Sequence, residues 1–149
     1  MIYVLIVVFI VIGEMYLKNY MEQTYDFKKQ NLFAGGKILL RKYHNYGAFL
    51  NFLQNKKKFL HTVSVLFTLG ISILFFITLG KYGKNLMKTG LCLLLGGAFS
   101  NTYDRLTKGY VIDYFSFITP FKKFNQIVFN LSDFCIIIGC LFLTLKDQS

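Results

Sequence analysis

Four long apolar runs alternate with polar connections along this chain of 149 residues. The run at 59–79 carries no formal charge and is close to the ~20 apolar residues that an α-helix needs to cross a bilayer. The loop after it is short, which predicts that the next helix is an antiparallel neighbour. The pattern predicts an all-α membrane protein of one domain, with four transmembrane helices near 1–20, 59–79, 87–104 and 125–145 and polar insertions at 21–58 and 106–123.

The first apolar run, MIYVLIVVFIVIG, is expected to be a retained helix. It has neither the basic start nor the small-residue cleavage site of a signal peptide. Its apolar part is short for a span, so the helix must carry Glu14 and Lys18 near one surface. These residues stand four positions apart on one helix face and can form an ion pair. An interfacial ion pair is the alternative to a more specific role.

The first insertion contains a strand-like segment and a turn. Residues 37–43 mix apolar and basic side chains, and Asn45 and Gly47 follow them. Gly47 lets the backbone turn or approach a ligand closely, and Asn45 could hydrogen-bond a peptide main chain. An ordinary Asn-x-Gly turn is the alternative. Because two spans separate the two insertions, both must lie on the same side of the membrane.

Composition supports a membrane protein. The chain is 54% hydrophobic, with 17 Phe and 10 Tyr, and its apolar residues are gathered in long runs. Its formal net charge is +10, for which anionic lipid head groups are the expected counter-charge. Nucleic-acid binding is not expected, because no basic face is separable from the membrane segments. The three cysteines and two histidines have no metal-ligand spacing, so neither a metal nor a cofactor is expected.

The stretch from Gly96 to Asp133 carries the candidate chemistry. Asp104, Arg105 and Asp113 lie in or beside its polar connection, and Asp133 lies within the last apolar run. Ionisable residues at membrane depth are costly, so they are candidates for function. Two carboxylates brought together could share a proton and activate water. In the alternative interpretation, Asp104 pairs with Arg105 or Lys108, while Asp113 and Asp133 cap helix ends.

Three motifs in this stretch resemble the lipoprotein signal peptidases (signal peptidase II), which are aspartic proteases of the bacterial cytoplasmic membrane. The motifs are Gly-Gly-Ala-x-x-Asn-x-x-Asp-Arg at 96–105, Gly-Tyr-Val-Ile-Asp-Tyr at 109–114 and Phe-Asn-x-Ser-Asp at 129–133. Each is weak alone, but three in order, joined by hydrophobic segments in a chain of this size, are specific. A fourth match is Asn45, Gly47 and Ala48 to an Asn-x-Gly-Ala motif of the family.

The resemblance implies an activity and a set of site residues. The family cuts prolipoprotein signal peptides just before a cysteine that bears a diacylglycerol, without a metal or cofactor. It implies Asp113 and Asp133 as the catalytic pair. Positions that match substrate-binding residues of the family are Asn45, Gly47, Asn101, Arg105 and Asn130; supporting residues are Glu14, Lys18 and Asp104.

The resemblance also implies an arrangement in the membrane. Both termini would be cytoplasmic, the active site would lie near the outer surface, and 37–54 would form a small extracytoplasmic sheet called a cradle. A monomer in contact with membrane lipids is expected. Charge favours the reverse orientation, because most Lys and Arg residues lie in the two insertions and the positive-inside rule would place these in the cytoplasm. The three ordered motifs are more specific than this rule, so the family orientation is expected.

The sequence departs from the family at three positions, which leaves other functions open. In the family's Asp-x-x-Ser/Thr-Lys motif Glu14 replaces Asp and Leu17 replaces the hydroxyl residue, and Ser100 replaces a Gly before Asn101. A catalytically inactive membrane binder of lipidated peptides with the same fold is therefore an alternative. A small proton-linked transporter is a third possibility, although four spans without an internal repeat argue against it.

Overall fold

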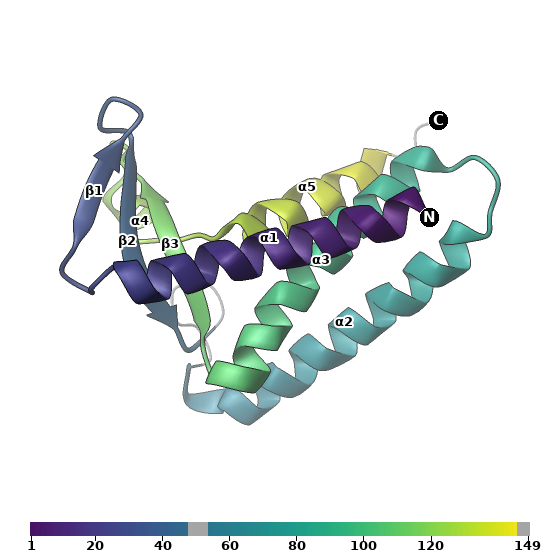
Figure 1. The fold of residues 1–149 in the computed structure, drawn as a ribbon, viewed down its shortest axis with the longest axis horizontal. Coiled ribbons are helices and arrows are strands. Elements are labelled where there is room, and N and C mark those ends of the chain that lie inside the picture. Colours follow the sequence, from purple (N-terminus) through teal and green to yellow (C-terminus); the bar gives the residue numbers. More distant parts are fainter. Residues whose placement is uncertain (48–53, 146–149) are drawn as a thin grey trace.

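The computed structural model describes residues 1–47 and 54–145, and the fold combines long helices with one small sheet (Figure 1). The helices are α1 (Ile2–Thr24), α2 (Lys57–Leu79), α3 (Asn85–Lys108), the short α4 (Lys122–Asn125) and α5 (Leu131–Leu145), with a 3₁₀ turn at Gln54–Lys56. The strands are β1 (Gln30–Phe33), β2 (Ile38–Asn45) and β3 (Val111–Phe117). The sheet lies at one end of the helices, and the N-terminus lies at the other (Figure 1).

Helix α3 lies at the centre and packs against α1, α2 and α5. Glycines on its surface make this possible, because a Cβ on Gly97 would lie 2.5 Å from the Ser132 carbonyl oxygen of α5. A Cβ on Gly96 would meet the Ile10 side chain of α1 at 2.8 Å. Small residues on α3 therefore let two neighbouring helices approach its backbone from different sides, as is common in membrane helix packing.

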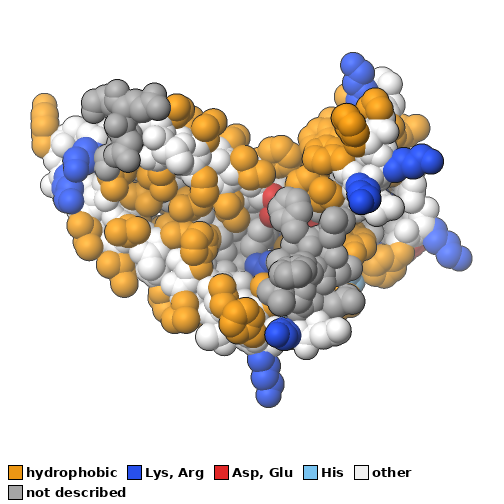
Figure 2. All heavy atoms as spheres, turned by 180° about the vertical axis from the view of Figure 1, so that it is seen from behind, with side chains coloured by type: hydrophobic (Ala, Val, Ile, Leu, Met, Phe, Trp, Pro, Cys, Tyr) orange, Lys and Arg blue, Asp and Glu red, His pale blue; other side chains and the backbone are white. Residues whose placement is uncertain are grey.

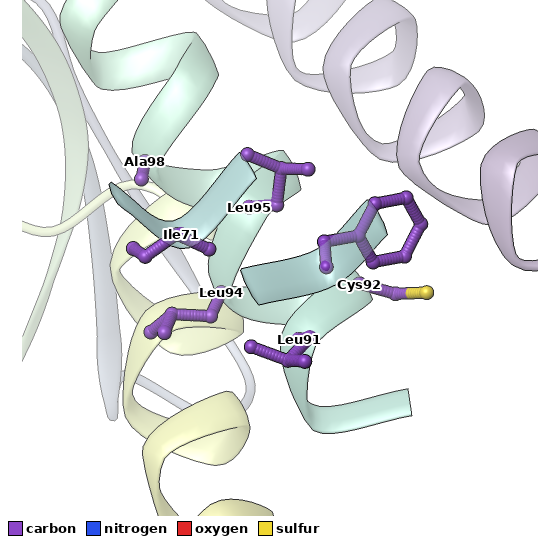
Figure 3. Close-up of a cluster of buried hydrophobic side chains, with 7 residues drawn as sticks. Ile71, Leu91, Cys92, Leu94, Leu95 and Ala98 are labelled. Atoms are coloured by element: carbon purple, nitrogen blue, oxygen red, sulfur yellow. The ribbon is translucent and has the colours of Figure 1, made fainter. Parts of the chain in front are cut away.

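The main apolar core lies where α2 meets α3, and Figure 3 shows its side chains. Ile71 and Phe75 of α2 pack there against five residues of α3: Leu91, Cys92, Leu94, Leu95 and Ala98. The outward faces of α1 and α2 are also apolar, with Phe9 79% and Phe76 65% exposed. Figure 2 shows hydrophobic side chains covering the helical part of one face. Such a surface is unusual for a water-soluble protein and is typical of helices that face lipid.

The sheet joins the two insertions. It is antiparallel in the order β1-β2-β3, and β3 comes from the second insertion. The β1–β2 hairpin turns through Ala34, Gly35 and Gly36, which all have positive φ. The strand-like pattern at 37–43 is confirmed by β2, whereas part of the sheet expected at 37–54 falls at 48–53, outside the described residues. Neither β1 nor β3 was expected, and β3 brings Val111 opposite Asn45.

The helix boundaries differ from the expected spans in an informative way. In the described part of the chain, α1 and α2 are long and apolar enough to cross a membrane, judged by length and composition alone. Helix α3 has 24 residues but includes several charges, and α5 is apolar but has 15 residues. The run expected at 125–145 is divided, because α4 ends at Asn125 and α5 begins only at Leu131. The cause of this late start is a side-chain cap, described below.

Candidate active site

Asp113 lies on β3 and is 2% exposed. Its two carboxylate oxygens accept hydrogen bonds from different elements. Asn45 Nδ2 at the end of β2 donates to Oδ2 at 3.0 Å, and Asn130 Nδ2 donates to Oδ1 at 2.6 Å. The backbone N–H of Gly47 donates to Asn45 Oδ1 at 3.1 Å, which turns the Asn45 amide so that its NH₂ faces Asp113. Gly47 thus acts on the site through Asn45.

Asp133 lies in the first turn of α5 and forms a reciprocal cap with Asn130. Asn130 Oδ1 accepts the backbone N–H of Asp133 at 3.0 Å, and Asp133 Oδ2 accepts the backbone N–H of Asn130 at 3.0 Å. This is the geometry of a capping box, and it sets the start of α5. The alternative that the aspartates cap helix ends is therefore correct for Asp133 and wrong for Asp113, which lies on a strand.

Asn130 links the two carboxylates directly. Its side chain donates to Asp113 and its backbone donates to Asp133, so one residue holds both acids. Asn101 adds a second link, since its Nδ2 donates to Asp133 Oδ1 at 3.1 Å while its Oδ1 accepts from Asn130 Nδ2 at 3.2 Å. The fold thus links two acids that are 20 positions apart in sequence through shared hydrogen-bond partners.

Lys18 sets the orientation of Asn101. Its Nζ donates to Asn101 Oδ1 at 2.8 Å and to Ser100 Oγ at 3.1 Å. Because an ammonium group can only donate, Asn101 must turn its oxygen toward Lys18 and its NH₂ toward Asp133. Ser100, which replaces a glycine of the family motif, thereby provides an additional acceptor for the lysine.

Lys18 also forms a buried ion pair that ties α1 to α3. Its Nζ lies 3.0 Å from Asp104 Oδ2 and 3.8 Å from Glu14 Oε1. The expected Glu14–Lys18 ion pair is present, but it is enclosed by protein, because the two residues are 0% and 1% exposed, respectively. Asp104 also accepts from Lys108 Nζ at 2.8 Å and from the backbone N–H of Ile112 at 3.3 Å. The pairing of Asp104 with Lys108 was expected, whereas that with Lys18 was not.

The electrostatics of the pair favour one retained proton. Burial raises the pKa of the Asp113 carboxyl, and the neighbouring charge of Asp133 raises this pKa further. The hydrogen bonds from Asn45 and Asn130 and the charge of Lys18 lower the same pKa, but they do not outweigh burial. Two like charges held close in a dry site resist joint ionisation, so the acids titrate as a coupled pair.

A cavity of about 280 Å³ opens beside the two carboxylates. Its polar wall includes Asn45, Asn101 and Arg105 as well as both acids, and its apolar wall includes Phe67 of α2 and Ile136 of α5. Figure 2 shows a hollow between the helices and the sheet, with acidic side chains visible in it. The cavity therefore combines the two acids with an apolar surface that α2 and α5 provide.

Arg105 is the cation of the cavity. It lies within electrostatic reach of Asp113, Asp133 and Asp104, which all interact favourably with its charge. Its Nε is buried and has no hydrogen-bond partner among the described residues. A fixed guanidinium with an unused donor is suited to bind a carbonyl oxygen of a ligand. Among the described residues, no group of three or more His, Cys, Asp or Glu is arranged to hold a metal ion.

Sequence reasoning missed two members of this site. Tyr114 donates its hydroxyl to Glu14 at 2.9 Å, and the backbone N–H of Ser132 donates to Glu14 at 3.3 Å. Tyr114 entered the sequence analysis only as the last residue of the motif at 109–114. Its place on β3 directly after Asp113 puts its side chain on the opposite face of the sheet, toward α1, and this became visible only with the strand.

Comparisons with known proteins agree with this geometry. The profile of the family described as signal peptidase (SPase) II matches residues 5–147. A lipoprotein signal peptidase of Caldicellulosiruptor bescii is 36% identical over 111 residues, which cover 74% of this chain and 67% of that protein. One from Lactiplantibacillus plantarum is 28% identical over 99% of this chain and 97% of its own length, and one from Buchnera aphidicola is 33% identical over 98% and 93%. A solved structure described as a bacterial membrane enzyme superposes with a TM-score of 0.85 at 26% identity, covering 99% of this chain and 89% of its own.

Proposed function

Because this chain belongs to the signal peptidase II family, we propose that it cuts prolipoproteins just before the diacylglyceryl-modified cysteine, with Asp113 and Asp133 as the catalytic pair. The chain is a protease of lipoprotein processing, and its family consists of bacterial membrane enzymes. The observation that carries the catalytic assignment is that Asn130 donates to both carboxylates at the wall of one cavity.

The proposed reaction needs only the two acids and water. The pair starts with one shared proton. The ionised carboxylate takes a proton from water as the water oxygen attacks the scissile carbonyl, and the neutral carboxyl gives its proton to the carbonyl oxygen. In the second half the tetrahedral intermediate collapses, the amine takes the proton that came from water, and the proton on the hydroxyl returns to the other carboxylate. The pair ends with the same single proton.

The remaining polar residues of the site fall into two groups, those whose donors already bind the carboxylates and one whose donor is unused. Asn45, Asn101 and Asn130 use their NH₂ groups on the carboxylates, so we assign them mainly to orienting the acids. Arg105 keeps a buried donor unused, and we assign it to a main-chain carbonyl of the substrate. The apolar wall with Phe67 and Ile136 is suited to the lipid or signal-peptide side of the substrate.

The membrane arrangement that fits this function has four spans. Helix α3 is long enough, because 24 residues give about 36 Å. Its charged residues Asp104 and Lys88 are buried against neighbouring elements, so lipid need not solvate them. Helix α5 gives only about 22 Å, which suits a helix whose first turn begins below the membrane surface at the active site. Cytoplasmic termini and a monomeric chain complete this proposal.

A cleavage assay with a diacylglyceryl-modified prolipoprotein tests the catalytic pair. Asp113→Asn and Asp133→Asn should each nearly abolish cleavage while the protein still accumulates in the membrane, because an amide cannot accept the proton from water. The double variant should be hardly worse than either single one. Asp26→Asn, at an exposed position outside the site, is the matched control. Near-parental turnover by either single variant would refute the assignment. Binding of the substrate without cleavage by the parent would instead favour an inactive binder.

A further inference from the structure

The start of α5 is held by four side-chain acceptors. The first backbone N–H groups of any helix lack partners within the helix and need acceptors from elsewhere. Those of Asn130 and Asp133 are satisfied by the mutual cap. The N–H of Leu131 donates to the Tyr114 hydroxyl at 3.0 Å, and that of Ser132 donates to Glu14 Oε1 at 3.3 Å. Half of these acceptors therefore come from β3 and α1.

Glu14 and Tyr114 are also bonded to each other. The Tyr114 hydroxyl donates to Glu14 Oε2 at 2.9 Å, so the hydroxyl accepts from α5 and donates to α1 at once. Glu14 is 0% exposed and accepts from Tyr114 with one oxygen and from Ser132 with the other. Both side chains are thus fully engaged, and neither has a second surface on which to bind substrate.

We propose that Glu14 and Tyr114 act as one positioning unit for the reaction, fixing the first turn of α5 so that Asp133 is held against the strand that carries Asp113. This inference rests on the proposed function. Tyr114 directly follows Asp113 on β3, and Ser132 directly precedes Asp133 on α5. The unit therefore includes the neighbour of Asp113 and binds the neighbour of Asp133. A change at Tyr114 or at the Glu14–Ser132 bond would move the two carboxylates relative to each other.

Backbone hydrogen bonds already join β3 to the segment before α5. The Glu14–Tyr114 unit adds contacts to the first turn of the helix. The N–H groups of Tyr114 and Phe115 donate to the Phe129 carbonyl at 2.9 and 3.0 Å. These bonds join the strand to the residue before the helix, and the packing of Gly97 against Ser132 holds the helix from the side of α3. The contacts through Tyr114 and Glu14 add direct bonds to the backbone of the first turn itself, from β3 and α1. Sub-ångström alignment of reacting groups has large effects on rate.

The chemistry of the two residues suits a permanent contact. Burial raises the pKa of the Tyr114 phenol, and the charge of Glu14 raises it further, so the phenol keeps its proton as a donor. Glutamate is one methylene longer than aspartate. In this chain the longer side chain reaches both the hydroxyl and the helix N-terminus, which gives a physical reason for glutamate at this position.

Tyr114→Phe is the sharpest test, because it removes one oxygen atom and leaves the ring in place. We expect kcat to fall between about tenfold and a hundredfold, the range for losing a hydrogen bond to a charged group, with KM nearly unchanged. Glu14→Gln and Glu14→Asp should show the same pattern, the first because an amide has one acceptor oxygen for two donors and the second because of its shorter reach. The double variant Tyr114→Phe with Glu14→Gln should be hardly slower than the worse single one. Tyr16→Phe, on the exposed face of α1, is the matched control.

Rates are measured per folded enzyme in detergent micelles, with thermal unfolding recorded in parallel. The positioning unit is overturned by any one of three results. These are a change in KM alone, losses of kcat that add up in the double variant, and a parental kcat in Tyr114→Phe. If Glu14→Gln does not accumulate, Tyr114→Phe decides alone. The proposed function is tested separately, because it fails if Asp113→Asn or Asp133→Asn remains active, or if the parent binds the substrate without cleaving it. Parental kcat in Tyr114→Phe beside an inactive Asp113→Asn would reject the unit and keep the catalytic pair.

Discussion

Replacing Gly97 with alanine should separate α3 from α5 at the level of the active site. The added Cβ would lie 2.5 Å from the Ser132 carbonyl oxygen and 2.9 Å from a side-chain carbon of Ile136. The first contact is with backbone, which cannot rotate away as a side-chain tip can. Helix α5 must therefore shift by an amount on the order of 1 Å, and a misplacement of this size can reduce a catalytic rate about a hundredfold.

Stability changes in two opposing directions in this variant. Overpacking costs about 1–3 kcal/mol, while alanine is favoured over glycine inside a helix by about 1 kcal/mol. The net free energy of unfolding should therefore fall by at most about 2 kcal/mol, so the protein should still fold while its activity falls much more. Gly13→Ala on α1 is the control, since a Cβ there meets nothing within 4 Å and should leave activity unchanged.

The assay pairs cleavage of a lipid-modified prolipoprotein with thermal unfolding of the purified protein in the same detergent. The expected result is a folded Gly97→Ala protein with a strongly reduced kcat, beside a Gly13→Ala protein with parental kcat. If Gly97→Ala matches Gly13→Ala in both measurements, the close contact between α3 and α5 does not constrain the position of Asp133, and the reasoning is wrong.

Three further predictions follow from the same contacts. The pKa of Asp113 is raised in the folded state above its usual 3.8, so ionisation of this carboxyl destabilises the fold as pH rises from 3.8 through the raised pKa. Asp113→Asn should therefore raise Tm relative to the parent by an amount that grows with pH and vanishes in acid. A Tm difference that stays constant with pH would contradict this. Arg105→Ala should weaken substrate handling more than Asn45→Ala and do so mainly in KM, and equal KM values for Arg105→Ala and the parent at equal protein levels would count against a substrate-facing Arg105. Asp104→Asn, which breaks buried ion pairs with Lys18 and Lys108, should lose activity in proportion to lost protein, which immunoblotting of membranes beside the cleavage assay would show.

Local sequence patterns predicted where the long helices lie because each contains an apolar run, although the last helix begins only at Leu131. The strand-like character of β2 was also visible, since it lies in a pattern of neighbouring residues. The pairing of β2 with β3 was not, because it joins segments about 70 positions apart, and no local pattern states which strand a segment will pair with. The late start of α5 has a different cause, namely that the Asn130–Asp133 cap overrides the apolar character of the residues before it.

Asp113 and Asp133 could be singled out from the sequence because they stand in recognisable motifs. The roles of the residues around them could not be predicted, because these roles depend on which way an amide or hydroxyl points. Asn101 matched a substrate-binding position of the family, yet its NH₂ group is occupied by Asp133. Glu14 looked like half of a surface ion pair, yet it accepts from a helix 118 positions away. Such contacts are fixed by helix packing, which the sequence of one segment does not encode.

Asn130 places a limit on how this enzyme can be stabilised. A serine or an aspartate at this position would cap α5 about as well as asparagine does, so a search for thermostable variants would accept either. Neither could supply the NH₂ group that asparagine gives to Asp113. Selection for melting temperature alone would therefore pass variants with an intact fold and impaired chemistry. Stabilising changes are better sought away from the first turn of α5, at positions where a helix cap does not also donate a hydrogen bond to Asp113.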